Sequence, residues 1–134
     1  MVFSILYLLT NFVYAQTCPP TKEIYVKHGN QYIPLPPTGW ELNNNWKSTI
    51  VAPEKLNFGI AAWGADLHPS KDKDNHVRCY YYSDPLDEKN QVSIQTGAVI
   101  DNSQIISHQE WEKSSLYSMC TDYKYHNVKS CPFA

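Results

Sequence analysis

Apolar and polar residues alternate along most of this chain, and few stretches show the three- to four-residue spacing of a helix. The clearest alternation covers residues 76–82, where Val77, Cys79 and Tyr81 share one side of an extended chain. We therefore predict a strand over this segment, with these three side chains in the core.

Turn-forming residues separate several other segments of the same kind. Strands are predicted over residues 22–27, 32–35, 47–52, 56–63 and 91–96, with shorter ones over 98–100 and 104–107 around a turn at 101–103, and one or two helical turns over 110–117. The alternation directs Leu56, Phe58 and Ile60 inward, and likewise Val92 and Ile94.

The first two of these strands are predicted to form a hairpin around a turn at residues 28–30. Pro34 has no N–H to donate, so we expect the returning strand at a sheet edge. Strands at short spacing predict a mostly β fold, a single small antiparallel sheet or sandwich stapled by two disulfides, with little helix. Parallel strands would need crossover helices, and no long enough helical segment is evident.

Residues 1–15 are almost entirely apolar. The run is shorter than the ~20 residues that cross a bilayer, and residues 13–15 form the small-x-small pattern that signal peptidase cuts. We predict a signal peptide over 1–15, cut after Ala15, and a single β-rich exported domain over 16–134. The segment lacks the usual basic start, so a buried strand or helix is the alternative. A lipoprotein anchor would need small residues directly before Cys18, which are missing.

Four cysteines follow this segment, at Cys18, Cys79, Cys120 and Cys131. An even number of cysteines behind a signal peptide predicts disulfides, because exported compartments are oxidising. Cys120 and Cys131 flank ten residues, so their bridge closes a short loop cheaply. The other bridge is then Cys18–Cys79, and each should stabilise the fold by about 2–4 kcal/mol. Zinc is the competing interpretation, but the close cysteine pairs typical of zinc sites do not occur.

Short motifs follow one another along the predicted domain. They are Cys18-Pro19, Gly39-Trp40, Phe58-Gly59-Ile60-Ala61-Ala62-Trp63, Val77-Arg78-Cys79-Tyr80-Tyr81 and Cys131-Pro132-Phe133. In this order they resemble a family of small secreted or periplasmic bacterial proteins, grouped as a domain of unknown function. The resemblance covers residues 16–134 and implies export, disulfides and a β-rich domain, but it implies no activity.

The charges are nearly balanced, with 11 basic and 13 acidic residues and a net charge of −2 at pH 7. They are mixed along the chain, without a basic block that could neutralise a row of phosphates or a Lys-rich amphipathic helix for a membrane surface. We therefore expect no nucleic-acid partner. We also expect no cofactor, no transmembrane segment after processing, and a monomer.

The most polar stretch, residues 66–75, and the adjacent His76 contain potential metal ligands. They are Asp66, His68, Asp72, Asp74, Asn75 and His76. Lys71 and Lys73 interleave with them and would repel a cation, and the Gly and closing Glu of a calcium loop are missing. We interpret the stretch as an exposed, solvated loop without a metal.

Catalytic motifs are weak in this sequence. A G-x-S-x-G elbow is missing, and bridged cysteines cannot act as thiolate nucleophiles. Glycoside cleavage uses paired carboxylates, and Glu110 and Glu112 alternate around Trp111, but nothing in the sequence indicates that they are buried. We therefore predict no catalytic residue.

Aromatic side chains offer the best candidates for ligand binding. Tyr80 and Tyr82 should project from one face of their strand beside Arg78, and tryptophans stand at Trp40 and Trp63. Aromatic rings stack on sugars, and Tyr, Trp and Arg dominate protein interfaces, although small β domains also fill their cores with aromatic rings. These five residues are our candidate binding residues.

The resulting hypothesis is a non-enzymatic exported protein, periplasmic or extracellular, that binds a protein or a glycan. A small exported hydrolase or hydrolase inhibitor is the alternative, and a structural component of the envelope is the third possibility. An exposed apolar patch that contains Tyr80, Tyr82 and a tryptophan would favour binding. A cleft that joins His76 or His108 to a carboxylate and a hydroxyl would favour an enzyme.

Overall fold

The computed structural model describes residues 16–43, 50–64, 75–84, 90–113 and 117–133. Within them, a two-stranded sheet pairs β1 (Tyr25–His28) with β2 (Gln31–Pro34). A six-stranded sheet has the order β3 (Trp40–Leu42), β6 (Gln91–Thr96), β5 (Val77–Tyr82), β4 (Asn57–Gly64), β8 (Tyr117–Thr121) and β7 (Glu112–Lys113). Every pair of neighbouring strands is antiparallel, which confirms the predicted fold class.

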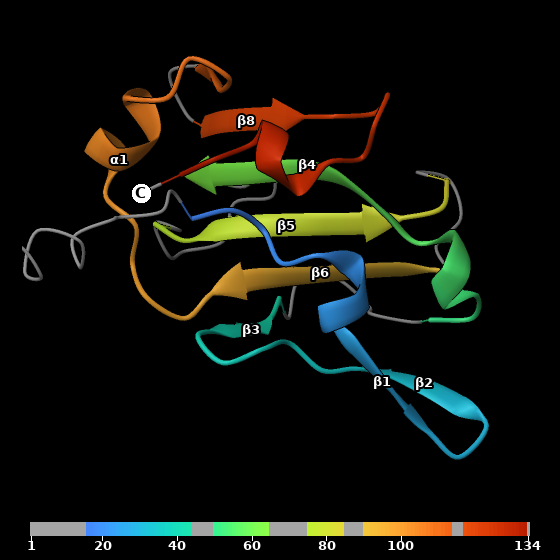
Figure 1. Cartoon of the computed structure of the whole chain (residues 1–134). Helices are drawn as coiled ribbons and strands as arrows, with labels where there is room; N and C mark the ends of the chain where they lie inside the picture. Colours follow the sequence, from blue (N-terminus) through green and yellow to red (C-terminus); the bar gives the residue numbers. More distant parts are fainter. Residues whose placement is uncertain (1–15, 44–49, 65–74, 85–89, 114–116, 134) are drawn as a thin grey trace, which may run out of the picture.

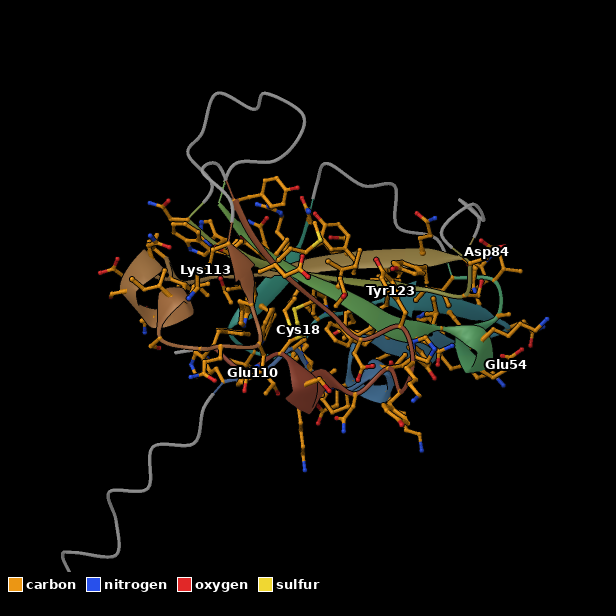
Figure 2. The ribbon with its side chains drawn as sticks, turned by 90° about the horizontal axis from the view of Figure 1, so that it is seen from above. Cys18, Glu54, Asp84, Glu110, Lys113 and Tyr123 are labelled. Carbon is orange, nitrogen blue, oxygen red and sulfur yellow. A yellow bond between two sulfur atoms is a disulfide. The ribbon has the colours of Figure 1, made fainter. Side chains whose placement is uncertain are left out.

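The short helices lie around this sheet (Figure 1). They are η1 (Thr21–Glu23), η2 (Pro53–Lys55), α1 (Asn102–Ile106) and η3 (Val128–Ser130). In Figure 2, η1 and η3 lie on the same side of the six-stranded sheet. We call the face of the sheet toward η1 and η3 the core face and the opposite face the outer face.

The central pair of strands, β5 and β6, follows the predicted alternation. Cys79 is opposite Ile94 and Tyr81 is opposite Val92. All four side chains are at most 1 % exposed and point to the core face. The strands and the inward residues predicted for segments 76–82 and 91–96 are thus confirmed.

Strand β4 departs from the predicted alternation at Gly59. Phe58 pairs with Tyr81, but Ile60 pairs with the next residue, Tyr80, so Gly59 is the extra residue of a β-bulge. The bulge reverses the faces of all residues beyond it. Ile60 therefore lies on the outer face, where the prediction placed it inward, and Ala61 enters the core instead.

The tail of the chain covers the core face. Phe133 is fully buried and packs edge-to-face against Trp40 and Trp111, with ring centroids 6.1 and 6.5 Å apart. Its N–H donates to the carbonyl of Gln16 at 2.7 Å, and Trp111 Nε1 donates to the carbonyl of Pro132 at 2.7 Å. Both ends of the described chain are therefore tied together over the sheet.

Both disulfides connect the sheet to these covering segments. Cys18–Cys79 joins the start of the domain to β5, and Cys120–Cys131 joins β8 to the residue after η3. All four cysteines are at most 3 % exposed. The predicted pairing is confirmed, and it is consistent with an oxidising, exported environment.

The prediction for residues 98–107 was wrong. Residues 98–100 form no strand, and Asn102–Ile106 is the helix α1. Asp101 accepts from the backbone N–H of Ser103, and the side chain of Gln104 accepts from the N–H of Asp101 at 2.9 Å. This reciprocal capping box begins a helix where the polar residues suggested a turn.

Further predictions differ from the structure. The strand predicted over 22–27 begins only at Tyr25, because Thr21–Glu23 is the 3-10 helix η1. Residues 50–52 of the segment predicted over 47–52 form no strand, and the rest of that segment lies outside the described residues. The helical turns predicted over 110–117 are wrong for the described part, because Glu112–Lys113 is the edge strand β7. It pairs with β8 through Met119 and Ser118.

Candidate binding surfaces

The candidate residues Arg78, Tyr80 and Tyr82 lie on the outer face of β5. Their neighbours across β6 are polar, because Arg78 pairs with Gln95 and Tyr80 pairs with Ser93. Alternation along the strand is the signal that places the three side chains together, as the sequence predicted.

Arg78 is buried to 2 % exposure within this outer face. Its Nη1 donates to the carbonyl of Gly64 at 2.9 Å, and its Nε donates to the hydroxyl of Tyr80 at 3.1 Å. A guanidinium removed from water needs such acceptors, so these bonds offset part of its desolvation. Arg78 therefore ties β5 to the end of β4 and orients the half-buried Tyr80 ring.

Tyr82 is also buried, at 8 % exposure. Its ring covers Gly59, because a Cβ built at that glycine would lie 2.6 Å from the Tyr82 hydroxyl oxygen. Burial, followed by a hydrogen bond with Tyr123, raises the pKa of the Tyr82 phenol far above its ordinary value. Tyr82 is thus a neutral side chain that joins the bulge of β4 to the tail.

The candidate tryptophans lie on the other side of the sheet, facing the core. Trp40 is half-buried against Phe133. Trp63 is half-buried too, and its Nε1 donates to the carbonyl of Ile100 at 2.8 Å. The five candidates are therefore divided between two faces of one sheet, and their role as ligand contacts stays a prediction.

Asp122 organises the turn that follows β8 and carries Tyr123. Its carboxylate accepts from the N–H of Tyr125 at 2.9 Å, from the hydroxyl of Ser130 at 2.8 Å and from the N–H of Asn127 at 3.2 Å. The bond from Tyr125, then that from Ser130, lowers the pKa of Asp122 below its ordinary value. This turn presents Tyr125 to solvent at 72 % exposure.

Two of the residues considered for metal binding, Asn75 and His76, lie in the described part and make hydrogen bonds within the domain. His76 Nδ1 donates to the carbonyl of Thr96 at 2.7 Å, and the carbonyl of Asn75 accepts from Ile100 at 2.7 Å. Residues 65–74 of the polar loop lie outside the described part. Within the described part, no group of three or more His, Cys, Asp or Glu side chains could hold a metal ion.

The carboxylates considered for glycoside cleavage are solvent-exposed. Glu110 and Glu112 are both exposed, while Trp111 between them is buried at 3 % exposure. Figure 2 shows Glu110 at the periphery of the molecule. Glycosidase carboxylates face each other across a substrate site, whereas Glu110 and Glu112 are both exposed to solvent.

The hairpin of β1 and β2 projects from the body of the molecule (Figure 1). Its two-residue turn begins with Gly29 at φ +64°, which is the conformation required at the first central position of a type II′ turn. The register pairs Val26 with Ile33 and Lys27 with Tyr32. The sequence predicted this hairpin and the edge position of its returning strand, but the candidate binding residues did not include it.

One face of the hairpin is apolar and exposed. Val26 and Ile33 are opposite each other at 41 % exposure each, and Leu35 follows on the same face at 55 %. The other face holds Tyr25 and Tyr32, whose rings meet edge-to-face at 5.8 Å. The alternating apolar residues in the sequence are the signal for this exposed apolar face, because a two-stranded hairpin has no second layer to cover them.

Comparison with known proteins returned no match to a family model, a curated protein or a solved structure. Within the described residues, no helix is long and apolar enough to span a membrane.

Proposed function

We propose that this chain is an exported binding protein without catalytic activity, which contacts a partner protein through the hairpin of β1 and β2. The observation that carries the proposal is the exposed apolar face of Val26, Ile33 and Leu35 on a projecting two-stranded sheet. Contiguous exposed apolar side chains mark interaction surfaces more often than scattered ones do.

The attachment of the hairpin to the core supports this role. An isolated two-stranded sheet is marginally stable in water. Here Ile24, directly before β1, is fully buried in the core, and its carbonyl accepts from the N–H of Leu35 at 2.8 Å. The base of the hairpin is therefore fixed, and its apolar residues stay exposed and ordered for a partner.

Export is the second part of the proposal. It is supported by the apolar segment 1–15 with its small-x-small end and by two bridges that need an oxidising compartment. The protein is then periplasmic or extracellular, of the kind that the resemblance to small exported bacterial proteins implies.

A capture experiment tests the binding role. The oxidised domain of residues 16–134 is immobilised and exposed to envelope and host extracts, and bound proteins are identified by mass spectrometry. We expect one partner to be retained by the native domain and lost with Val26→Thr/Ile33→Thr, because threonine keeps the strand shape and removes the apolar surface. The matched control is Val51→Thr/Val99→Thr, which changes valines exposed to 71 % and 65 % elsewhere.

The outcomes are distinct. A partner that both double variants retain contradicts the hairpin surface, and the variant Tyr80→Ala then tests the outer face. A native domain that retains no specific partner contradicts the binding function itself.

A further inference from the structure

The direction of the backbone groups shows which edge of the hairpin is open. The N–H of Leu35 donates to the carbonyl of Ile24, so these two residues form a hydrogen-bonded pair. Bonded and non-bonded pairs alternate along an antiparallel ladder. The N–H and C=O of Tyr25 and of Lys27 therefore point away from β2. In the parts of the chain that the structure describes, no backbone hydrogen bond reaches these groups.

The two edges of the hairpin are not equivalent. On β2, Pro34 is opposite Tyr25 and therefore occupies a non-bonded position. A residue at such a position points its N–H outward, but proline has no N–H. Proline at an edge blocks the addition of a further strand. The edge of β1 has no such block, because Tyr25 and Lys27 each offer both a donor and an acceptor.

The side chains around this edge define the partner's chemistry. The side chains of an added strand would alternate between two faces. One set would lie next to Val26 on the apolar face, and the other set would lie next to Lys27 on the opposite face. Between Ile24 and Trp40 the chain has no Asp or Glu, although its net charge is −2. The exposed Lys27 therefore has no carboxylate on its own hairpin.

We propose that the edge of β1 accepts an extended segment of the partner protein in which apolar residues alternate with acidic ones. The apolar residues extend the face of Val26 and Ile33, and the carboxylates face Lys27. Backbone bonds to Tyr25 and Lys27 hold the segment as a third strand, the mode known as strand addition. This inference deepens the proposed function and rests on it.

Charge separates this partner from a second copy of the chain. Two β1 strands placed side by side would each bring Lys27, and strand β1 carries no carboxylate to oppose it. Like charges across neighbouring strands are destabilising, whereas opposite charges stabilise the pair. An acidic strand therefore fits this edge better than β1 of a second copy of the chain does.

The test uses a short capped peptide that alternates valine and glutamate as the probe. Its binding to the oxidised domain is followed by amide chemical shifts and by hydrogen exchange. We expect the largest shifts at residues 25–28 and slower exchange at the amides of Tyr25 and Lys27. A peptide that alternates valine and lysine is the charge control, and the first peptide with N-methylated glutamates is the backbone control. Both should bind at least about fivefold more weakly.

Two variants connect the binding to Lys27. Lys27→Glu reverses the charge at an exposed position and should weaken binding of the glutamate peptide about fivefold, with a smaller difference at high salt. Lys27→Pro removes the outward N–H, as Pro34 does on the other edge, and should abolish binding. Lys55→Glu, an exposed charge reversal on η2, should leave it unchanged. Circular dichroism and thermal unfolding verify that each variant is folded.

Several results would overturn the inference. They are equal affinity for both charged peptides, undiminished binding by Lys27→Pro while that variant is folded, shifts centred outside residues 24–35, and concentration-dependent dimerisation through β1. If the capture experiment still retains a partner that depends on Val26 and Ile33, the proposed function stands without strand addition. If capture also fails, both fall.

Discussion

At the scale of single residues, close contacts on the outer face decide which substitutions the fold tolerates. Tyr82 leaves no room for a side chain at Gly59, since a Cβ would lie 2.6 Å from its hydroxyl oxygen and 2.8 Å from Cζ. Gly59→Ala should therefore lower the free energy of unfolding by about 1–3 kcal/mol, because the ring must move. Urea unfolding measures this change. In a Tyr82→Ala background the alanine should cost less than half as much, and an unchanged cost would contradict the contact.

Asp122 should make the stability of the tail turn depend on pH. Its pKa is lowered in the folded state, so its contribution is present above about pH 4, the usual range of an aspartate, and is lost as pH falls through the lowered value. Unfolding free energies measured between neutral pH and pH 3 should fall less steeply for Asp122→Asn than for the native protein. Parallel curves would show that the hydrogen bonds from Tyr125 and Ser130 do not act on this carboxylate.

At this scale, the burial of individual side chains could not be predicted from the sequence alone. Alternation correctly placed Arg78, Tyr80 and Tyr82 on one face, but burial also depends on which partners meet them across strands. The hydrogen bonds of Arg78 to Gly64 and of Tyr82 to Tyr123 join residues distant in the chain. Such contacts leave no local signature in the sequence.

At the scale of elements, the central strands were predictable and their irregularities were not. Regular alternation identified β5 and β6 and their inward residues. The bulge at Gly59 shifted the register of β4 within an otherwise alternating segment, and a glycine inside a strand is the signal for it. The helix α1 was missed although Asp101 and Gln104 have the spacing of a capping box, because its apolar face is only one turn long.

The two disulfides should differ in their contribution to stability. The residues of Cys18–Cys79 are separated by 61 positions and those of Cys120–Cys131 by 11. In the chain-entropy model the longer loop gives about 1.5 kcal/mol more stabilisation. Replacing each pair by alanines and comparing urea unfolding should show the larger loss for Cys18–Cys79. A larger loss for Cys120–Cys131 would indicate that the packing of the tail, rather than loop entropy, dominates.

At the scale of the whole molecule, the body and the hairpin differ in how they are held together and in what they expose. The body joins its strands, tail and start through two bridges and a buried core. The hairpin leaves this body with exposed apolar residues and one open edge. Sequence could predict the scaffold and the hairpin, whereas the open edge required the register of Leu35 with Ile24.

Export makes a prediction about the mature molecule. Mass spectrometry of the exported protein should show an N-terminus at Gln16 and a loss of four hydrogens for the two bridges. Gln16, the predicted new N-terminus, is exposed, and its carbonyl accepts from the N–H of Phe133. An intact residue 1 together with free thiols would contradict export.

Site-specific photo-cross-linking in producing cells tests whether the hairpin contacts a partner protein. A photoreactive amino acid replaces Ile33 on the apolar face or, as the control, Val99 on the body, which is exposed to 65 %. Cross-linked proteins are then identified by mass spectrometry. We expect one dominant partner cross-linked from position 33 and none from position 99. Equal cross-linking from both positions, or none from position 33 in correctly exported protein, would contradict this contact.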